Sequence, residues 1–267
     1  MISCTFNGRL GNHLYPIATA LSLAKKLKED CIFPNDSYAG HRGNVKVDLS
    51  MFKYNFNRGV IKENTQYDHH VDDYKEIPLV KNTTISGFYQ DYRYFDDIRD
   101  ELLNKYFVPT DEISEKISKI EISPNSLGVS VRRGDYLMLQ HNHCVLSDQY
   151  YSDAINMYFQ DADQLFVFSD DFAWCKQTFG DGAIYVNDSV GMQLFLMTKM
   201  KHLILSNSTF AWWGGYLNNN NGNIIIPDPW YGPNYDDRGK GLIYPSWKIL
   251  KHERKLHPFQ MTANMYN

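Results

Sequence analysis

Hydrophobic and polar positions in the second half of the chain follow two alternating periods. Short apolar runs typical of buried strands lie at residues 127–131, 165–169, 183–186, 202–206 and 224–226. Between them, a 3.6-residue period predicts helices at 147–159, 172–179, 190–200 and 209–217. This regular alternation predicts a parallel sheet with helices on both of its faces.

The first residues show the same pattern once. A strand is predicted at 2–6, a glycine loop at 7–12 and an amphipathic helix from Leu14 to about Leu27. The apolar run Cys31–Phe33 then predicts a second strand. These elements form one βαβ unit, with the glycine loop at the carboxyl end of its first strand.

The middle of the chain is less regular. Residues 35–80 are polar and weakly patterned, and the elements predicted after them are a strand at 84–89 and helices at 94–107 and 111–121. The last helix stops before Pro124, where we place a domain boundary. The sequence therefore predicts an α/β fold of two Rossmann-like domains facing across a cleft. Their expected limits are 1–123, rejoined by 245–267, and 124–244.

Composition and charge exclude some classes of partner and indicate a location for the protein. The 267 residues include 27 Lys+Arg and 31 Asp+Glu, a net charge of −4, so we expect no nucleic-acid partner. No apolar run approaches 18 residues, so we expect no transmembrane anchor. The expected location is cytoplasmic, in solution or peripheral at the inner membrane surface. The four cysteines are scattered without paired spacing, which disfavours a zinc site.

Polar clusters follow the predicted strands. They lie at 8–12, 132–135, 169–171 and 206–209, each at the carboxyl end of a strand. Open α/β sheets bind ligands beyond these ends, so we expect the four clusters to line one cleft.

The cluster at 132–135 carries the most specific chemistry. The guanidinium groups of Arg132 and Arg133 match phosphate oxygens and stay charged at any working pH. Asp135 can orient an arginine or accept a proton. The alternative is a surface Arg–Asp pair.

The other clusters can bind the same anion. Ser206, Asn207, Ser208 and Thr209 open a helix, whose first N–H groups can bind phosphate, although such residues also serve as simple caps. Ser169 and Asp170 end a strand, and an aspartate there can cap the next helix or bind a ribose or base.

The amino-terminal loop brings Gly8, Gly11 and Asn12 to the same cleft. Its Gly-x-x-Gly spacing lacks the third glycine of a dinucleotide fingerprint, which disfavours a nicotinamide-dependent oxidoreductase. His13 starts the following helix, either as a capping or core residue or as a proton acceptor in the cleft.

Taken in order, these clusters resemble the α-1,2-fucosyltransferase family. The similar segments are Gly8–His13, Ser130–Asp135, Phe168–Asp171 and Ser206–Trp213, and Gly87–Gln90 and Pro227–Trp230 also resemble family segments. The resemblance spans nearly the whole chain.

The resemblance implies a GT-B glycosyltransferase that binds GDP-fucose in its carboxyl-terminal domain. It implies transfer of L-fucose, with inversion and without a divalent metal, to a glycan hydroxyl such as O2 of a terminal galactose. It places Arg132 on the diphosphate, supported by Asp135, with Ser208 and Thr209 near the phosphates. Asn12 is expected where the amino-terminal loop closes over the donor.

Two positions depart from the family pattern. Ser130 stands where the family has histidine, and His13 where it has glutamine. These departures keep open a different donor, such as GDP-L-galactose, or a nucleotide- or carbohydrate-binding module without catalysis. Asp135 and His13 are the candidate bases. No metal or other cofactor is expected, because Asp161–Asp163, an Asp-x-Asp run, precedes its strand, on the wrong side of the sheet.

Overall fold

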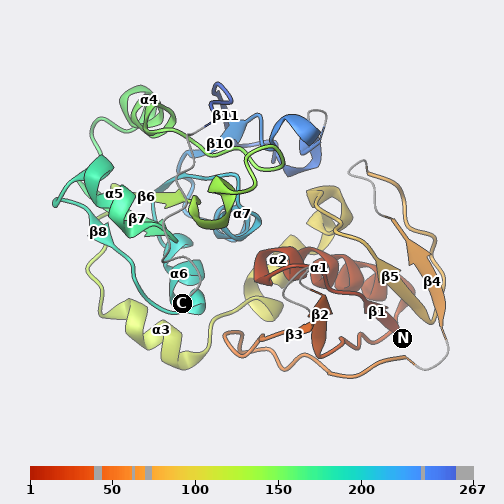
Figure 1. The fold of residues 1–267 in the computed structure, drawn as a ribbon. Coiled ribbons are helices and arrows are strands. Elements are labelled where there is room, and N and C mark those ends of the chain that lie inside the picture. The colour runs from red at the N-terminus through yellow and green to blue at the C-terminus, as the bar shows by residue number, and fades with distance from the viewer. Residues whose placement is uncertain (39–43, 62–63, 70–73, 236–237, 257–267) are drawn as a thin grey trace.

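The computed structural model describes residues 1–38, 44–61, 64–69, 74–235 and 238–256. Two halves lie side by side, the amino-terminal one in red to orange and the carboxyl-terminal one in green to blue (Figure 1). Each half contains a parallel sheet. Among the described residues, no helix has the length and apolar character needed to cross a bilayer.

The larger sheet lies in the carboxyl-terminal half. Its six described strands follow the spatial order β11-β10-β9-β6-β7-β8, and every neighbouring pair is parallel. The strands are β6 (Ser126–Val131), β7 (Gln164–Ser169), β8 (Ile184–Tyr185), β9 (His202–Ile204), β10 (Ile224–Asp228) and β11 (Lys248–Lys251). This confirms the predicted parallel sheet.

Helices cover both faces of this sheet, as predicted. They are α4 (Asp148–Tyr158), α5 (Phe172–Phe179), α6 (Val190–Met197) and α7 (Thr209–Tyr216). Strand residues alternate between the two faces. Val129 and Val167 pack with α4 and α5, whereas Phe166, Phe168 and Leu203 pack with α6 and α7.

The amino-terminal half is built around a smaller sheet. Its described strands follow the order β1-β5-β4, with α1 packed against β1, and β2 and β3 form a separate antiparallel pair. The elements are β1 (Ile2–Cys4), α1 (Leu10–Leu27), β2 (Asp36–Tyr38), β3 (Asn44–Lys46), β4 (Thr65–Asp68) and β5 (Thr83–Ser86). Helix α3 (Asp111–Ser118) follows in the chain but packs against α6 of the other half (Figure 1). The predicted strand at 31–33 is wrong, because Cys31 and Phe33 form only isolated bridges.

The helix predicted at 94–107 is broken into short turns. These are η2 (Tyr92–Tyr94), η3 (Asp96–Ile98), α2 (Arg99–Glu101) and the π-helical η4 (Leu102–Tyr106). Phe95 leaves helical geometry, with φ −145° and ψ 4°, and buries its ring against Trp212 and Trp213. Packing against the second half therefore overrides the local helical preference.

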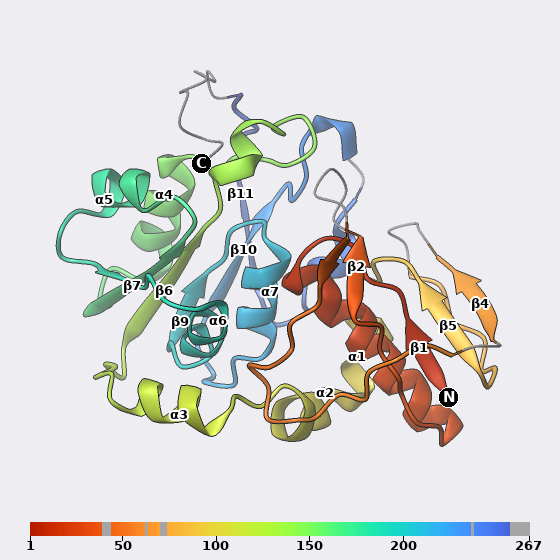
Figure 2. The same cartoon turned by 60° about the horizontal axis from the view of Figure 1, so that its bottom comes forward.

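The two halves share one core. Helix α1 packs against α7, and both are seen side by side in Figure 2. The indole Nε1 of Trp213 donates a hydrogen bond of 3.0 Å to the carbonyl of Gly11. The division near residue 124 stays a prediction.

The carboxyl-terminal segment does not return to the amino-terminal half over its described part. Strand β11 pairs in parallel with β10, at the edge of the six-stranded sheet. Leu250 completes the core on the α4 and α5 face. We expected residues 245–267 to rejoin the amino-terminal half. This expectation is wrong for residues 248–251, because their backbone pairs with the free edge of β10. Residues 257–267 lie outside the described part of the chain.

Candidate active site

The topology of the larger sheet defines where a ligand binds. The chain runs outward from β6 to β7 and β8 and then returns to β9, on the other side of β6. A crevice forms beyond the carboxyl ends of strands at such a reversal. Arg132 follows β6 and Ser206 follows β9, so two predicted clusters flank this point. The hydroxyl oxygens of Ser130 and Ser206 lie 2.9 Å apart and join them.

The amino-terminal half brings a second helix start to the crevice. A Cβ on Gly11 would lie 2.4 Å from the backbone nitrogen of Phe210, so only glycine allows this approach. The hydroxyl of Thr209 donates to Asn12 Oδ1 at 2.8 Å. The first turns of α1 and α7 therefore meet, and both present the positive end of a helix dipole.

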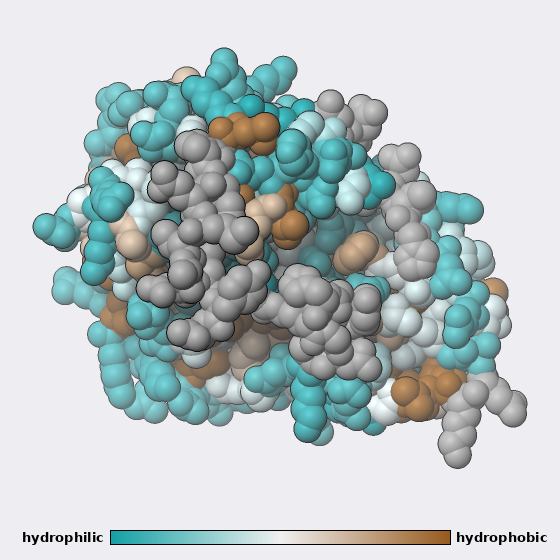
Figure 3. Space-filling view, viewed as in Figure 1, coloured by the Kyte–Doolittle hydropathy of each residue, from teal (hydrophilic) through white to brown (hydrophobic). Residues whose placement is uncertain are grey.

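Two adjoining cavities of about 400 and 410 Å³ occupy the crevice. The surface is hollowed where the halves meet (Figure 3). The cavities share Arg9, Gly11, Arg132, Ser208 and Phe210. One is largely apolar and holds the side chain of Gln193, whereas the other is polar and aromatic. We call the shared part the junction.

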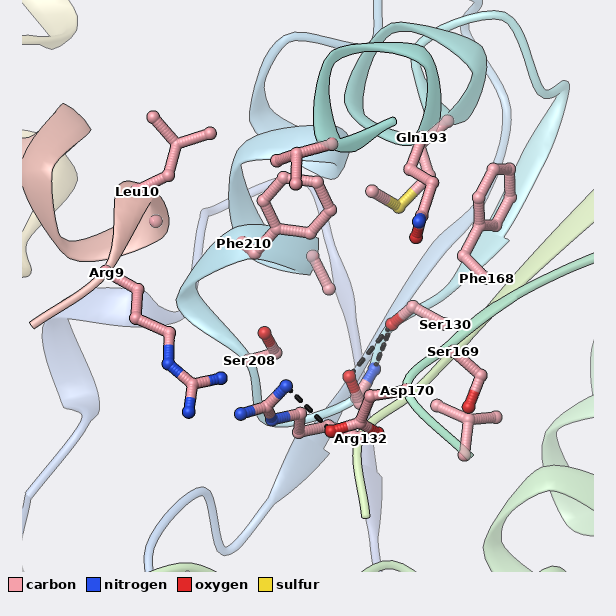
Figure 4. A pocket seen from close by; sticks show the side chains of 16 residues that line it. Arg9, Leu10, Ser130, Arg132, Phe168, Ser169, Asp170, Gln193, Ser208 and Phe210 are labelled. Atoms are coloured by element: carbon pink, nitrogen blue, oxygen red, sulfur yellow. Dashed lines mark hydrogen bonds and ion pairs between the residues drawn. The ribbon is translucent and has the colours of Figure 1, made fainter. Parts of the chain in front are cut away.

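Two arginines reach the junction from opposite halves. Arg132 pairs with Asp135 at 2.5 Å and with Asp170 at 2.7 Å. Arg9 pairs with the other oxygen of Asp135 at 2.9 Å. The two guanidinium groups lie below Ser208 in Figure 4. The carboxylates hold the guanidinium groups in place, so their orientation does not depend on a ligand.

The junction is suited to an anion. The guanidinium of Arg132 carries five N–H donors, more than its two ion pairs use. Ser208, the N-cap residue of α7, makes no side-chain cap hydrogen bond to its helix. The first N–H groups of that helix therefore add to the positive potential of the arginines.

Arg133 does not reach either cavity, contrary to the sequence prediction. Its guanidinium lies over the Trp174 ring at 4.3 Å and pairs with Asp171 at 3.3 Å. The residue is buried, and its backbone N–H donates to Asp170. Successive side chains in extended backbone point in opposite directions, so only one arginine of the pair can face the cleft.

The position of His13 does not fit the catalytic role that the sequence suggested for it. Its side chain is buried and does not line either cavity. The ring Nε2 donates to the Gly8 carbonyl at 3.0 Å and lies 2.9 Å from Ser37 Oγ. Burial lowers the pKa of His13 to about 4, so the ring is neutral at pH 7. His13 therefore holds the glycine loop.

The remaining predicted residues gather around the cleft. Ser169, Asp170 and Ser206 line the apolar cavity, and Gly8, Asn12, Asp135, Asn207 and Thr209 line the polar one. Asn207 is held in place because its amide donates to the carbonyls of Cys144 and Trp230. Among the described residues, no group of three or more His, Cys, Asp or Glu side chains could hold a metal.

Several side chains of the cleft were not predicted from the sequence, among them Arg9, Gln193 and His143. Arg9 lay inside the recognised glycine loop, and its charge was a usable signal. Gln193 lies on a predicted helix, and His143 lies in the loop before α4, where no periodic pattern indicates an orientation.

Comparisons with known proteins identify the family of the chain. Residues 1–251 match the family model described as Glycosyl transferase family 11. The O-antigen biosynthesis glycosyltransferase WbnK of Escherichia coli is 28% identical over 307 residues, covering 92% of this chain and 99% of that protein. The Alpha-1,2-colitosyltransferase of Escherichia coli is 30% identical over 219 residues, covering 76% and 71%.

A solved structure shows the same fold. Fucosyltransferase NodZ from Bradyrhizobium superposes with a TM-score of 0.55 at 13% identity, covering 80% of this chain and 90% of that one. NodZ has also been co-crystallised with GDP. The likeness confirms the α/β fold of GT-B type.

Proposed function

Since the chain belongs to glycosyl transferase family 11, we propose that it transfers L-fucose from GDP-β-L-fucose to a glycan hydroxyl. The expected acceptor atom is O2 of a terminal galactose. The reaction inverts the anomeric carbon and needs no metal ion. The observation that carries the proposal is the junction, where two arginines and two helix starts surround one space.

Each part of the nucleotide sugar has a matching surface. The diphosphate occupies the junction, where Arg132 and Arg9 donate hydrogen bonds to its oxygens. The base enters the apolar cavity, whose walls include Phe168 and Met197 and where Gln193 offers an amide oxygen. The Gln193 amide nitrogen already donates to the carbonyl of Asp188 at 2.9 Å. The sugar and the acceptor occupy the polar cavity.

The chemistry follows from this placement. The acceptor oxygen forms a bond to C1 as the bond from C1 to the β-phosphate oxygen breaks, and the electron pair leaves with GDP. Negative charge grows on the diphosphate, where preorganised donors stabilise the transition state more than the ground state.

A direct assay tests the function. Purified protein with GDP-fucose and a panel of galactosides is expected to yield a product linked through O2, with inverted configuration by NMR. EDTA is expected to leave the rate unchanged, because cationic side chains perform the charge neutralisation that a metal supplies elsewhere. Strict dependence on manganese would contradict the proposal.

A second donor is supported by two observations. Ser130 stands where the family pattern has histidine, and one relative of 30% identity is a colitosyltransferase. Adding GDP-colitose and GDP-L-galactose to the assay compares these sugars directly. Binding of GDP without turnover of any donor would favour a non-catalytic module instead.

The proposed role of Arg133 gives a separate prediction. Arg133→Ala is expected to lower the free energy of unfolding by about 1–3 kcal/mol, because it removes the buried contact with Trp174. Its affinity for GDP is expected to stay close to that of the wild type. Urea unfolding and calorimetric titration measure the two effects. A large loss of GDP affinity with unchanged stability would show that Arg133 binds the donor.

A further inference from the structure

The proposed transfer requires a group that takes the proton of the acceptor hydroxyl, and neither candidate from the sequence suits this role. His13 is buried outside both cavities. Asp135 lines the polar cavity, but each of its oxygens is paired with a guanidinium, Oδ1 with Arg132 and Oδ2 with Arg9. Both oxygens are therefore occupied, and the carboxylate is needed to orient the arginines.

His143 lines the same cavity and is held rigidly. Its ring stacks on the ring of Tyr136, with the two centroids 4.4 Å apart and the planes at 11°. The ring centroid of Tyr231 lies 6.2 Å from that of His143 on a tilted plane. Its backbone N–H donates to the Leu139 carbonyl at 2.9 Å, and the residue forms a bridge with Tyr231. The position of the ring is therefore fixed before a ligand binds.

The ring nitrogens of His143 are available for chemistry. Among the described residues, neither nitrogen has a hydrogen-bond partner. The charged groups that face the ring are Asp135 and Arg132, and the phenols of Tyr136 and Tyr231 pack against it. Burial lowers the pKa of His143, Asp135 raises it and Arg132 lowers it, and the net effect is a lower pKa. The ring is thus neutral at pH 7. Burial also raises the pKa of Tyr136 to about 12, so that phenol is not a competing base.

We propose that His143 is the general base of the transfer. A ring nitrogen takes the proton of the acceptor hydroxyl while the oxygen bonds to C1, and GDP leaves with the electron pair toward Arg132 and Arg9. The imidazolium then releases its proton to solvent. Inversion requires the acceptor to approach from the side opposite the diphosphate, in the polar cavity that His143 lines. This inference rests on the proposed function.

The pH dependence of kcat tests the assignment. In the wild type, kcat is expected to fall at acid pH, with an apparent pKa lower than is usual for histidine, because the base must be neutral to act. His143→Gln is expected to lower kcat by about 10²–10⁴ and to abolish this acid limb, with little change in GDP affinity. The matched control is His141→Gln, an exposed histidine two residues away, which is expected to behave like the wild type.

Azide separates a base from a structural residue. Azide is an anionic nucleophile without a proton to lose, so it is expected to restore turnover of GDP-fucose by His143→Gln and to form the glycosyl azide. A residue that only maintained the fold would not show this rescue.

Asp135→Asn gives a second test on a variant that keeps His143. It removes the group that raises the pKa of His143, so the acid limb is expected to move to lower pH.

The outcomes are distinguishable. An active wild type whose His143→Gln variant keeps its rate and its acid limb would overturn the assignment of the base alone. An acid limb of kcat that stays at the same pH in Asp135→Asn would also overturn this assignment. A wild type that turns over no nucleotide sugar would overturn the proposed function together with the base.

Discussion

Arg132→Ala is expected to lower kcat by about 10²–10³, the scale seen when one preorganised donor to a developing anion is lost. Arg132 is held by Asp135 and Asp170 at the junction of the two cavities, so its donors are in place before the leaving group gains charge. Steady-state kinetics with GDP-fucose and the accepted galactoside measure the effect.

Two further variants sharpen this result. Arg132→Lys keeps the charge but loses the planar fork, so it is expected to recover only part of the rate. Arg9→Ala removes the more exposed arginine of the junction and is expected to have a smaller effect. Near-normal turnover by a folded Arg132→Ala variant would contradict the proposed placement of the diphosphate.

Trp213→Ala is expected to lower the free energy of unfolding by about 3–5 kcal/mol, the range for removing a large aromatic side chain from a core. Trp213 is fully buried and packs against Tyr15, Phe95 and Phe107 of the other half. It also bonds the Gly11 carbonyl, so the substitution leaves both a cavity and an unpaired carbonyl. Urea unfolding measures the loss.

Trp213→Phe separates the two causes. It keeps an aromatic ring but loses the indole N–H, which leaves the Gly11 carbonyl unpaired. The free energy of unfolding is therefore expected to fall by a smaller amount, about 1–3 kcal/mol. If Trp213→Ala lowered the free energy of unfolding by less than about 1 kcal/mol, the packing of the two halves would not depend on this side chain.

The larger sheet was predictable because its pattern is local. Each strand from 127 to 226 is a short apolar run, and each connection carries a helical period, so their order alone determines a parallel sheet. The polar residues that follow β6, β7 and β9 were found for the same reason. Carboxyl ends of parallel strands share one edge, and residues at that edge meet.

The directions of individual side chains were not predictable. Strand β6 alternates serine or glycine with leucine or valine, but every residue of it is buried, so the alternation does not indicate which of its two faces leads to the cleft. The structure turns Arg132 inward and Arg133 toward Trp174. His13 was ambiguous in the same way, because α1 is buried on nearly all sides.

The order of strands and helices in the sequence is enough to give the fold class, the edge of the sheet at which the site lies and most of the residue types that form it. Which of these side chains reach the ligand space depends on the packing of the two halves. Contacts between residues far apart in the chain, such as Arg9 with Asp135, Gly11 with Phe210 and His143 with Tyr231, fix those orientations. No local pattern records them, because they depend on how the two halves pack.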